Sequence, residues 1–249
     1  MDWFTTLNYV WISIAVITFL TLVFTKIRAP YGRHTTKGWG PMISNKWGWF
    51  WMEVPAFLIF PLLAILGPRD KDVLTWILIA LWTFHYFNRT IIFPFKLKTK
   101  GKKMPLTIPL SAIFFNGMNG FLNGYYLGYF GPADKAWNTV VVVLGISIFF
   151  IGFLINYITD QKLIALRKIK EGYSIPRGWL FEKISCPNHF GEVLEWTGFA
   201  IAAGSLPAAT FAIWTFCNLA PRALNHHDWY HEHFKEYPKE RKAFIPYVW

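Results

Sequence analysis

Residues 8–25 read NYVWISIAVITFLTLVFT, an apolar run that is followed at once by Lys26 and Arg28. A helix needs roughly 17–25 predominantly apolar residues to cross the hydrocarbon core of a bilayer. The run contains Trp11 and ends in basic residues, where a removable signal peptide would end in a small-residue cleavage site. It therefore predicts a first transmembrane helix.

Six further apolar runs follow along the 249 residues. The chain is 54% hydrophobic and only 16% charged, whereas a soluble domain is roughly 25% charged. We therefore predict an all-α integral membrane protein, a seven-transmembrane-helix bundle that forms one membrane-embedded domain over residues 1–249. The predicted spans lie near residues 8–25, 48–67, 73–95, 105–130, 136–159, 190–206 and 207–222, the last two divided at Pro207.

The basic residues test this number of spans independently. Of the 25 Lys and Arg residues, 21 lie in the alternate connections 26–47, 96–104 and 160–189 and in the tail from residue 222. Because such residues collect in cytoplasmic loops, the pattern predicts an N-terminus outside and a C-terminus in the cytoplasm. The net charge of +11 then reflects topology and contact with membrane lipids rather than nucleic-acid binding. Nothing in the sequence indicates a protein partner.

Polar residues interrupt the third apolar run. The stretch LWTFHYFNRTIIF (residues 81–93) holds His85, Tyr86 and Arg89 between apolar flanks. In the predicted topology Glu53 of span two lies roughly 9 Å from the cytoplasmic end, and Tyr86 about 15 Å. Ionisable groups at such depth usually face the bundle interior or a wet cavity and mark functional sites. A structural ion pair, such as Glu53 with Arg89, is the alternative.

Three polar stripes mark the inner ends of the last three spans. Members of one stripe are three, four or seven residues apart, so they share a helix face. Arg binds phosphate bidentately, and Asn and carboxylate groups bind amides and hydroxyls, so together the stripes predict a cytosol-facing nucleotide pocket. For each stripe alone, a solvated helix face is the alternative. The stripes are Asn156, Asp160 and Arg167; Asn188, Glu192 and Glu195; and Arg222, His226 and Tyr230.

The nucleotide-binding motifs of soluble domains do not occur in the sequence. Without G-x-G-x-x-G or G-x-x-x-x-G-K-[ST], a Rossmann or P-loop domain is excluded. We also predict no metal site, because outside NHHDWYHEH (residues 225–233) the histidines are scattered singly. A surface-lying amphipathic helix accounts for His227, His231 and His233.

Several motifs, in the same order, resemble the steroid 5α-reductase family. They are FHYFNRT (84–90), LINYITDQKLIALRK (154–168), YSIPRGWLF (173–181), NHFGEVLEW (188–196) and the C-terminal stretch from Gly198. The resemblance covers about Glu53 to Trp249. It implies a seven-span bundle that binds NADPH from the cytosolic side and transfers hydride to the β-carbon of a 3-keto-4-ene steroid. We expect a bacterial member of the family.

The resemblance also implies residue roles. Tyr86 in HYFNR and Glu53 in MEVP match the pair that holds the 3-keto oxygen. Hydride addition pushes negative charge onto that oxygen, where a tyrosine hydroxyl and a protonated glutamate would stabilise it. Cofactor contacts are implied for Asn156, Asp160, Arg167, Asn188, Glu192, Arg222, His226 and Tyr230.

Aromatic residues would complete the substrate site. Trp49, Phe115 and Trp214 would form an apolar slot for a flat ring system, although lipid-facing or core positions also account for such side chains.

Three other functions stay open at this point. A membrane methyltransferase of the isoprenylcysteine type would use S-adenosylmethionine and would not require the Glu–Tyr pair. A reductase could act on a non-steroid enone lipid. A transporter would need access from both faces, but the outer half of the predicted bundle has almost no ionisable groups. The host membrane is a bacterial inner membrane or an endoplasmic reticulum.

Overall fold

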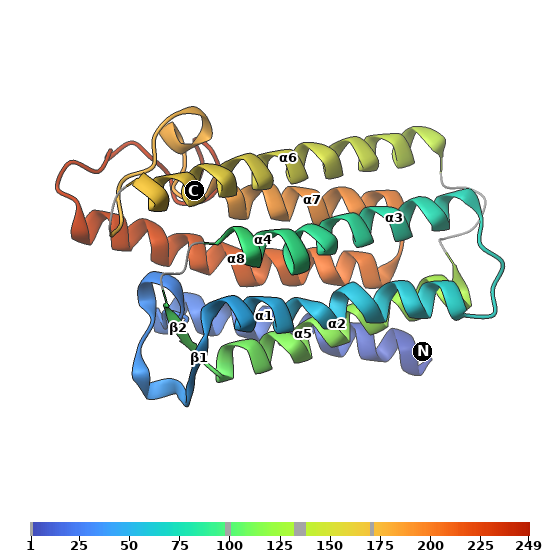
Figure 1. The fold of residues 1–249 in the computed structure, drawn as a ribbon. Coiled ribbons are helices and arrows are strands. Elements are labelled where there is room, and N and C mark those ends of the chain that lie inside the picture. The colour runs from blue at the N-terminus through green and yellow to red at the C-terminus, as the bar shows by residue number, and fades with distance from the viewer. Residues whose placement is uncertain (1, 98–100, 132–137, 170–171) are drawn as a thin grey trace. The chain divides into compact units, whose positions relative to one another are not determined.

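The computed structural model describes residues 2–97, 101–131, 138–169 and 172–249. Helices make up most of it (Figure 1), and a short antiparallel pair, β1 (Met42–Ser44) and β2 (Lys103–Pro105), sets Ile43 opposite Met104. The helices are α1 (Trp3–Thr25), α2 (Asn45–Leu66), α3 (Val73–Phe87), α4 (Phe93–Lys96), α5 (Thr107–Tyr125), α6 (Thr139–Ile169), α7 (Pro187–Ala203) and α8 (Leu206–His233). Asn88–Ile92 and Tyr126–Phe130 are π-helical turns, and Gly32–His34, Lys37–Trp39 and Trp179–Glu182 are 3₁₀ turns.

The seven predicted apolar runs lie largely in seven long helical segments. Among the described residues, α1, α2 and α6 are long and apolar enough to cross a membrane, which fits an integral membrane protein. The other four are shorter, interrupted or more polar. For example, α3 is 15 residues long before its π turn, and α5 buries three asparagines. The start predicted for the fifth span, at residue 136, lies outside the described residues. Seven spans and the orientation of the termini stay predictions.

The break between the last two helices lies close to its predicted place. Helix α7 ends at Ala203, and Gly204 adopts a left-handed backbone with φ of 54° before α8 begins at Leu206. Pro207, where we predicted the division, instead occupies the first turn of α8. A proline is tolerated there because its missing N–H would have no partner within the helix.

Backbone contacts group the chain into two compact units. The terminal unit comprises residues 1–28, 143–201 and 209–249, and the central unit comprises residues 29–142 and 202–208. Each unit is described by itself below. This grouping does not decide between one domain and two, so the single domain over residues 1–249 stays a prediction.

A seam of glycines joins α6 and α7 in the terminal unit. A Cβ added at Gly152 would collide with the Glu195 nitrogen, and one at Gly198 would collide with the Phe149 nitrogen. Small residues allow two helix backbones to approach this closely, which is how transmembrane helices commonly pack. The seam therefore fixes the rotation of α6 against α7.

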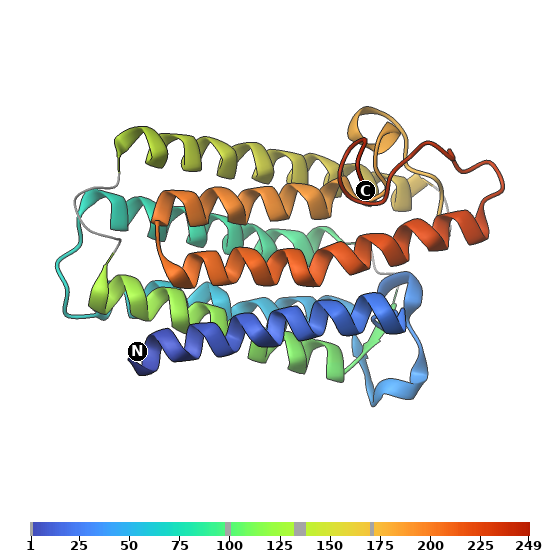
Figure 2. The same ribbon diagram turned by 180° about the vertical axis from the view of Figure 1, so that it is seen from behind.

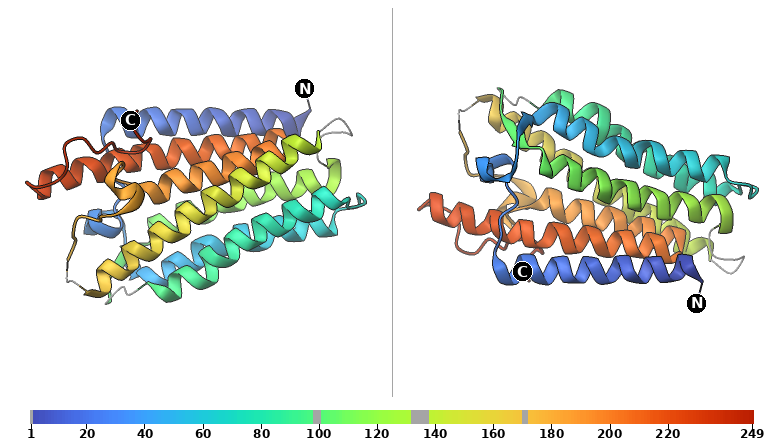
Figure 3. Two further views of the ribbon diagram at one scale, coloured as in Figure 1. Left: turned by 90° about the horizontal axis from the view of Figure 1, so that it is seen from above. Right: turned by 90° about the horizontal axis from the view of Figure 1, so that it is seen from below.

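Helices α8 and α1 continue this unit beyond α7. Trp196 of α7 packs on Phe211 of α8 with ring centroids 4.5 Å apart, and Trp214 of α8 packs on Trp11 of α1 at 4.7 Å. Figures 2 and 3 accordingly show the four helices side by side in the order α6, α7, α8, α1. The C-terminal ends of α6 and α8 lie at the same end of this unit as the N-terminal end of α7.

The central unit is built on the close pair α2 and α5. A Cβ at Gly124 of α5 would meet the Phe60 carbonyl oxygen of α2 at 2.6 Å, so glycine is required for this approach. Strands β1 and β2 lead into α2 and α5 respectively, so the two helices start at the same end. Helix α3 returns along α2, held by a hydrogen bond of 2.9 Å from Trp82 Nε1 to the Ala56 carbonyl oxygen.

Candidate functional site

Glu53, a predicted catalytic residue, is buried on α2 of the central unit. It is 7% exposed, and its Oε2 accepts a hydrogen bond of 3.0 Å from Asn116 Nδ2 on α5. The same amide group donates to the Met52 carbonyl oxygen at 2.6 Å. Asn116 therefore holds the carboxyl group in a fixed position between two helices.

Tyr86, the other predicted catalytic residue, is buried on α3 in the same unit. It is 3% exposed, and its ring packs against Trp82 and His85 with centroid distances of 5.1 and 5.0 Å. Trp82 also stacks on Phe60 of α2 at 4.3 Å. Trp82 thus anchors α3 to α2 one helical turn before Tyr86.

Glu53 and Tyr86 lie at the same level of this helix pair. Helices α2 and α3 run in opposite directions (Figure 1), and the bond between Trp82 and Ala56 marks a common height. From that bond Glu53 is three residues back along α2 and Tyr86 is four residues onward along α3. These steps are about 4.5 and 6 Å in the same direction. The two predicted catalytic residues therefore lie at a similar level along this helix pair.

A π-helical turn begins two residues after Tyr86, and no pattern described above predicted it. The turn spans Asn88–Ile92, and Phe93 N donates to the Asn88 carbonyl oxygen, five residues back. Pro94 has no N–H to donate to the Thr90 carbonyl oxygen, so a regular α-helical ladder cannot continue there. This proline was the available signal, since π turns in helices frequently lie at functional sites.

Arg89 lies in this turn, over aromatic rings. Its guanidinium carbon is 5.2 Å from the Trp49 ring centroid and 4.7 Å from that of Phe93. A guanidinium over an aromatic face is stabilised by the ring quadrupole. The aromatic rings of Trp49 and Phe93 therefore offer Arg89 a favourable environment besides the alternative pairing with Glu53.

The three predicted substrate-slot residues divide between the units. Trp49 and Phe115 are half-buried in the central unit, where Trp49 also meets Tyr31 at 6.3 Å. Trp214 is in the terminal unit and packs on Trp11 of α1. The structure does not place Trp214 relative to the other two, so the slot stays a prediction.

In the terminal unit, four predicted cofactor residues form one hydrogen-bonded network across α6 and α7. Asn156 Nδ2 donates to the Asn188 carbonyl oxygen at 3.0 Å and to Glu192 Oε2 at 3.2 Å. Asn188 Nδ2 donates to Asp160 Oδ1 at 3.2 Å. Asn156 and Asp160 are buried, at 2% and 7% exposed. The two stripes predicted from helical spacing therefore face each other.

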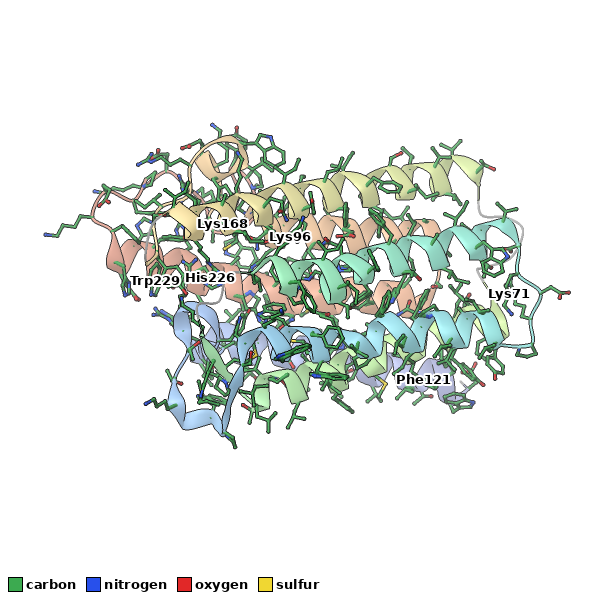
Figure 4. All side chains as sticks on the ribbon, in the orientation of Figure 1. Lys71, Lys96, Phe121, Lys168, His226 and Trp229 are labelled. Atoms are coloured by element: carbon green, nitrogen blue, oxygen red, sulfur yellow. The ribbon has the colours of Figure 1, made fainter. Side chains whose placement is uncertain are left out.

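The third stripe follows α8 at the same end of this unit. The His226 ring lies 5.7 Å from the ring of His189 on α7, and buried Tyr230 stacks on Tyr237 at 5.0 Å with an interplanar angle of 3°. Half-buried Arg222 lies one turn before His226. Figure 4 labels His226 and Trp229 on this part of α8.

Arg167, also predicted to bind the cofactor, lies exposed near the C-terminal end of α6, next to the Lys168 that Figure 4 labels. Its guanidinium carbon is 5.7 Å from the ring centroid of Tyr173, which in turn packs on Trp229 of α8 at 5.2 Å. Basic groups therefore border the network of amides and carboxylates. This combination suits a nucleotide, because arginine binds phosphate and the buried polar groups suit hydroxyls and amides.

A polar cluster behind Tyr230 was missed by the sequence analysis. Ser185 Oγ lies 2.7 Å from His227 Nδ1 and 2.6 Å from the Tyr237 hydroxyl. Arg241 is 1% exposed, donates to the Pro176 carbonyl oxygen at 3.1 Å and lies 3.5 Å from Glu182. Long-range packing creates this cluster, so no local pattern could have revealed it.

The cluster corrects our prediction for one histidine. His231 and His233 are exposed, as the surface-helix interpretation predicts, but His227 is half-buried. Burial, and then the charge of His231, lower the pKa of His227 from 6.5 to about 4. Because it is neutral at physiological pH, His227 can share a hydrogen bond with Ser185 without burying a charge.

Comparison with known proteins identifies related sequences. The model of the family described as 3-oxo-5-alpha-steroid 4-dehydrogenase matches residues 102–249. A steroid 5-alpha-reductase of Gossypium hirsutum is 39% identical and covers 95% of this chain and 93% of its own length. A 3-oxo-5-alpha-steroid 4-dehydrogenase 1 of Bos taurus is 40% identical, and the match covers 97% of this chain and 95% of the relative. The human protein of the same name is 38% identical, and the match covers 88% of this chain and 85% of the relative. These relatives come from plants and animals and give no support to a bacterial source.

Proposed function

Because this chain belongs to the 3-oxo-5-alpha-steroid 4-dehydrogenase family, we propose that it reduces the 4,5 double bond of a 3-keto-4-ene steroid to the 5α-reduced product, with NADPH as the reductant. Membership makes it an oxidoreductase that acts on a CH–CH bond. The observation that carries the proposal is the pair Glu53 and Tyr86, buried at one level on neighbouring helices. Such a pair can meet one ketone oxygen from two sides.

Tyr86 donates its hydroxyl proton to the ketone oxygen in a hydrogen bond. When hydride reaches the β-carbon, electron density moves onto that oxygen, and the hydrogen bond strengthens as the charge develops. The tight packing of the ring against Trp82 keeps the hydroxyl in place, so little reorganisation is needed in the transition state.

Glu53 assists at the same oxygen. A protonated carboxyl group donates a second hydrogen bond, and its Oε2 can still accept from Asn116. Asn116 thereby orients the group through a helix that carries neither catalytic residue. A proton from solvent water then bonds to the α-carbon, and the negative charge on the oxygen is lost as the C=O double bond re-forms.

We propose that the stripes on α6, α7 and α8 bind the cofactor, which supplies the hydride when bound. Arg222 and Arg167 would pair with phosphate groups, and Asn156, Asp160, Asn188 and Glu192 would bind hydroxyl and amide groups. His226 and Tyr230 offer ring surfaces and hydrogen-bonding atoms on α8. The donor set fits a phosphorylated dinucleotide, because it combines cations with buried amides and carboxylates.

The proposal places the protein in a bacterial inner membrane or an endoplasmic reticulum, crossed by seven spans with the cofactor site on the cytoplasmic side. The distribution of 21 of 25 basic residues supports this orientation. A lipid-like substrate would then reach Tyr86 from the bilayer, while the cofactor would reach the stripes from the cytosol.

The alternatives differ in what supports them. Methyl transfer would give the buried pair Glu53 and Tyr86 no catalytic role. The family match also favours reduction. Reduction of a non-steroid enone lipid uses the same pair and cofactor, so it stays the second candidate. The names of the relatives favour a steroid.

Thermal unfolding of the purified protein tests the cofactor and the reaction class together. We expect NADPH to raise the unfolding temperature and S-adenosylmethionine to leave it unchanged, because only a binding ligand stabilises the folded state. Arg222→Ala should lower the affinity for NADPH roughly tenfold or more, since a charge-assisted contact contributes about 1.5–3 kcal/mol. The rise in unfolding temperature at a given NADPH concentration should therefore be smaller.

The same preparation should remove the absorbance of the enone of a 3-keto-4-ene steroid when NADPH is added. Stabilisation by S-adenosylmethionine alone, without loss of the enone, would overturn the proposal in favour of methyl transfer. Reduction of a polyprenyl enone but not of the steroid would favour the second candidate.

A further inference from the structure

Asn116 of α5 contacts two acceptors on α2, and none of the motifs quoted above contains this residue. Its Nδ2 donates to the Met52 carbonyl oxygen at 2.6 Å and to Glu53 Oε2 at 3.0 Å. The side chain is buried, with 4% of the residue exposed. An amide nitrogen has two N–H groups, and both are used here, so the amide is held in one orientation.

The other two buried asparagines of α5 bond within their own helix. Asn119 Nδ2 donates to the Phe115 carbonyl oxygen at 2.8 Å, and Asn123 Nδ2 donates to the Asn119 carbonyl oxygen at 3.0 Å. A bond to the carbonyl oxygen four residues earlier satisfies a short polar side chain locally. Asn116 instead donates across to α2, beside a predicted catalytic residue.

The Met52 carbonyl oxygen determines which atom of the amide faces Glu53. A carbonyl oxygen only accepts hydrogen bonds, so the nitrogen of Asn116 must face Met52. Rotation of the amide by half a turn would set Oδ1 against this oxygen, and two acceptors repel each other. The group that Asn116 presents to Glu53 Oε2 is therefore an N–H donor.

An N–H donor at Oε2 distinguishes the two oxygens of Glu53. A neutral carboxyl group carries its proton on one oxygen, and the other oxygen is the better acceptor. We propose that Asn116 is a positioning residue for the reaction. It keeps Oε2 as the acceptor and so places the Glu53 proton on Oε1, where it can be donated to the ketone. This inference rests on the proposed function and on a neutral Glu53.

The effect of Asn116 should appear mainly in turnover. Without this bond the proton could occupy either oxygen and the carboxyl group could rotate, so fewer complexes would present an O–H to the ketone. That hydrogen bond strengthens as hydride transfer moves charge onto the ketone oxygen. Loss of its alignment therefore lowers kcat more than it raises KM.

Asn116→Leu keeps the branched side chain and removes the donor. We expect kcat for a 3-keto-4-ene steroid to fall roughly tenfold or more, KM to change much less, and stabilisation by NADPH to remain. Asn123→Leu is the matched control, because Asn123 is also buried on α5 and donates to the Asn119 and Pro207 carbonyl oxygens. It should keep kcat near the wild-type value. Equal losses of kcat in the two variants, or none in Asn116→Leu, would overturn the proposal.

Asn116→Asp adds a measurement that a purely structural role would not change. A neutral aspartic acid still donates one O–H to Oε2, whereas an ionised one competes for the Glu53 proton, since two adjacent carboxyl groups share one proton. The kcat of this variant should approach that of the wild type as the pH is lowered. Asn123→Asp should show no such recovery. A pH profile of Asn116→Asp parallel to that of the wild type would contradict the proposal.

Infrared difference spectroscopy of the purified protein tests the proton without requiring turnover. The C=O stretching band of a protonated Glu53 should disappear in Glu53→Gln. The band should move to higher frequency in Asn116→Leu, because Oε2 loses a hydrogen bond, and should stay in place in Asn123→Leu. Absence of a protonated carboxyl band that depends on Glu53, or a band that does not move in Asn116→Leu, would overturn the proposal. If the wild-type protein reduces no enone with NADPH but the band moves as expected, the proposed function fails and the position of the proton stands.

Discussion

Tyr86 and Glu53 have different surroundings, and these surroundings suggest different roles at one ketone oxygen. The tyrosine ring is enclosed by Trp82 and His85, so its hydroxyl is placed by packing. The Glu53 carboxyl is placed by a hydrogen bond from Asn116. The packed ring holds the Tyr86 hydroxyl in one direction. The hydrogen-bonded carboxyl group of Glu53 can instead adjust as the charge on the ketone oxygen changes. We therefore assign the main donor role to Tyr86.

Tyr86→Phe tests that assignment, since it keeps the ring and deletes the hydroxyl. The variant should fold, should still be stabilised by NADPH and should lose turnover of a 3-keto-4-ene steroid roughly a hundredfold or more. The measurement is kcat from the loss of enone absorbance. Tyr129→Phe is a suitable control, because Tyr129 is exposed and stacks on Tyr125 by its ring. Turnover of Tyr86→Phe at the wild-type rate would remove Tyr86 from the mechanism.

Glu53→Gln distinguishes the two possible charge states of the carboxyl group. If a neutral Glu53 donates to the ketone, glutamine still supplies a donor, and the variant should retain measurable turnover while Glu53→Ala retains less. If an ionised Glu53 must pair with Arg89, glutamine should be nearly as damaging as alanine. We expect the first result, because Arg89 already has Trp49 and Phe93 as partners. Equal losses in the two variants would contradict it.

Among the secondary-structure elements, the α6–α7 pair determines where the candidate cofactor residues lie. The glycine seam brings the two backbones together, and the network from Asn156 to Glu192 and Asp160 begins one turn from Gly152. The polar contacts across the helices are only about 3 Å long, so a small separation of the helices would break them. The seam and the network therefore depend on each other.

Gly152→Ala should disrupt both. The added methyl group would collide with the Glu195 and Gly191 backbones, and overpacking of this kind typically costs about 1–3 kcal/mol. We expect a lower unfolding temperature together with weaker stabilisation by NADPH. Gly117→Ala on α5 is the control, since its nearest neighbour would be Ile59 at 3.9 Å, and it should be neutral or slightly stabilising. Wild-type NADPH binding by Gly152→Ala would contradict the role of the seam.

Over the whole molecule, the positions of the helices could be predicted and their long-range contacts could not. Apolar runs located the long helical segments because burial in a bilayer demands them, and Pro207 marked the last break to within a few residues. Helical spacing placed Asn156, Asp160, Asn188 and Glu192 on two facing stripes. The contact of Tyr237 with Ser185 joins residues 52 positions apart, so no local pattern contains it. The π turn after Tyr86 depends on Pro94, and a proline in a helical run can end the helix, kink it or produce such a turn.

The orientation in the membrane is a prediction for the whole chain. A reporter fused after Trp249 should be cytoplasmic, and one inserted at Asp70, between α2 and α3, should be external. The basic residues of alternate connections give the physical reason, because they remain on the cytoplasmic side during insertion. Placement of both reporters on one side of the membrane would rule out the seven-span arrangement and the cytosolic cofactor site that depends on it.

Transfer of hydride from NADPH to the β-carbon of the enone is the central claim, and isotopic labelling tests it most directly. Purified protein would be given a 3-keto-4-ene steroid and NADPH with deuterium at the transferred position, and the product would be analysed by mass spectrometry and NMR. We predict a 5α-reduced ketone that carries one deuterium at C5 and none at C4. A product without deuterium, deuterium at C4, or an unchanged steroid would contradict the account.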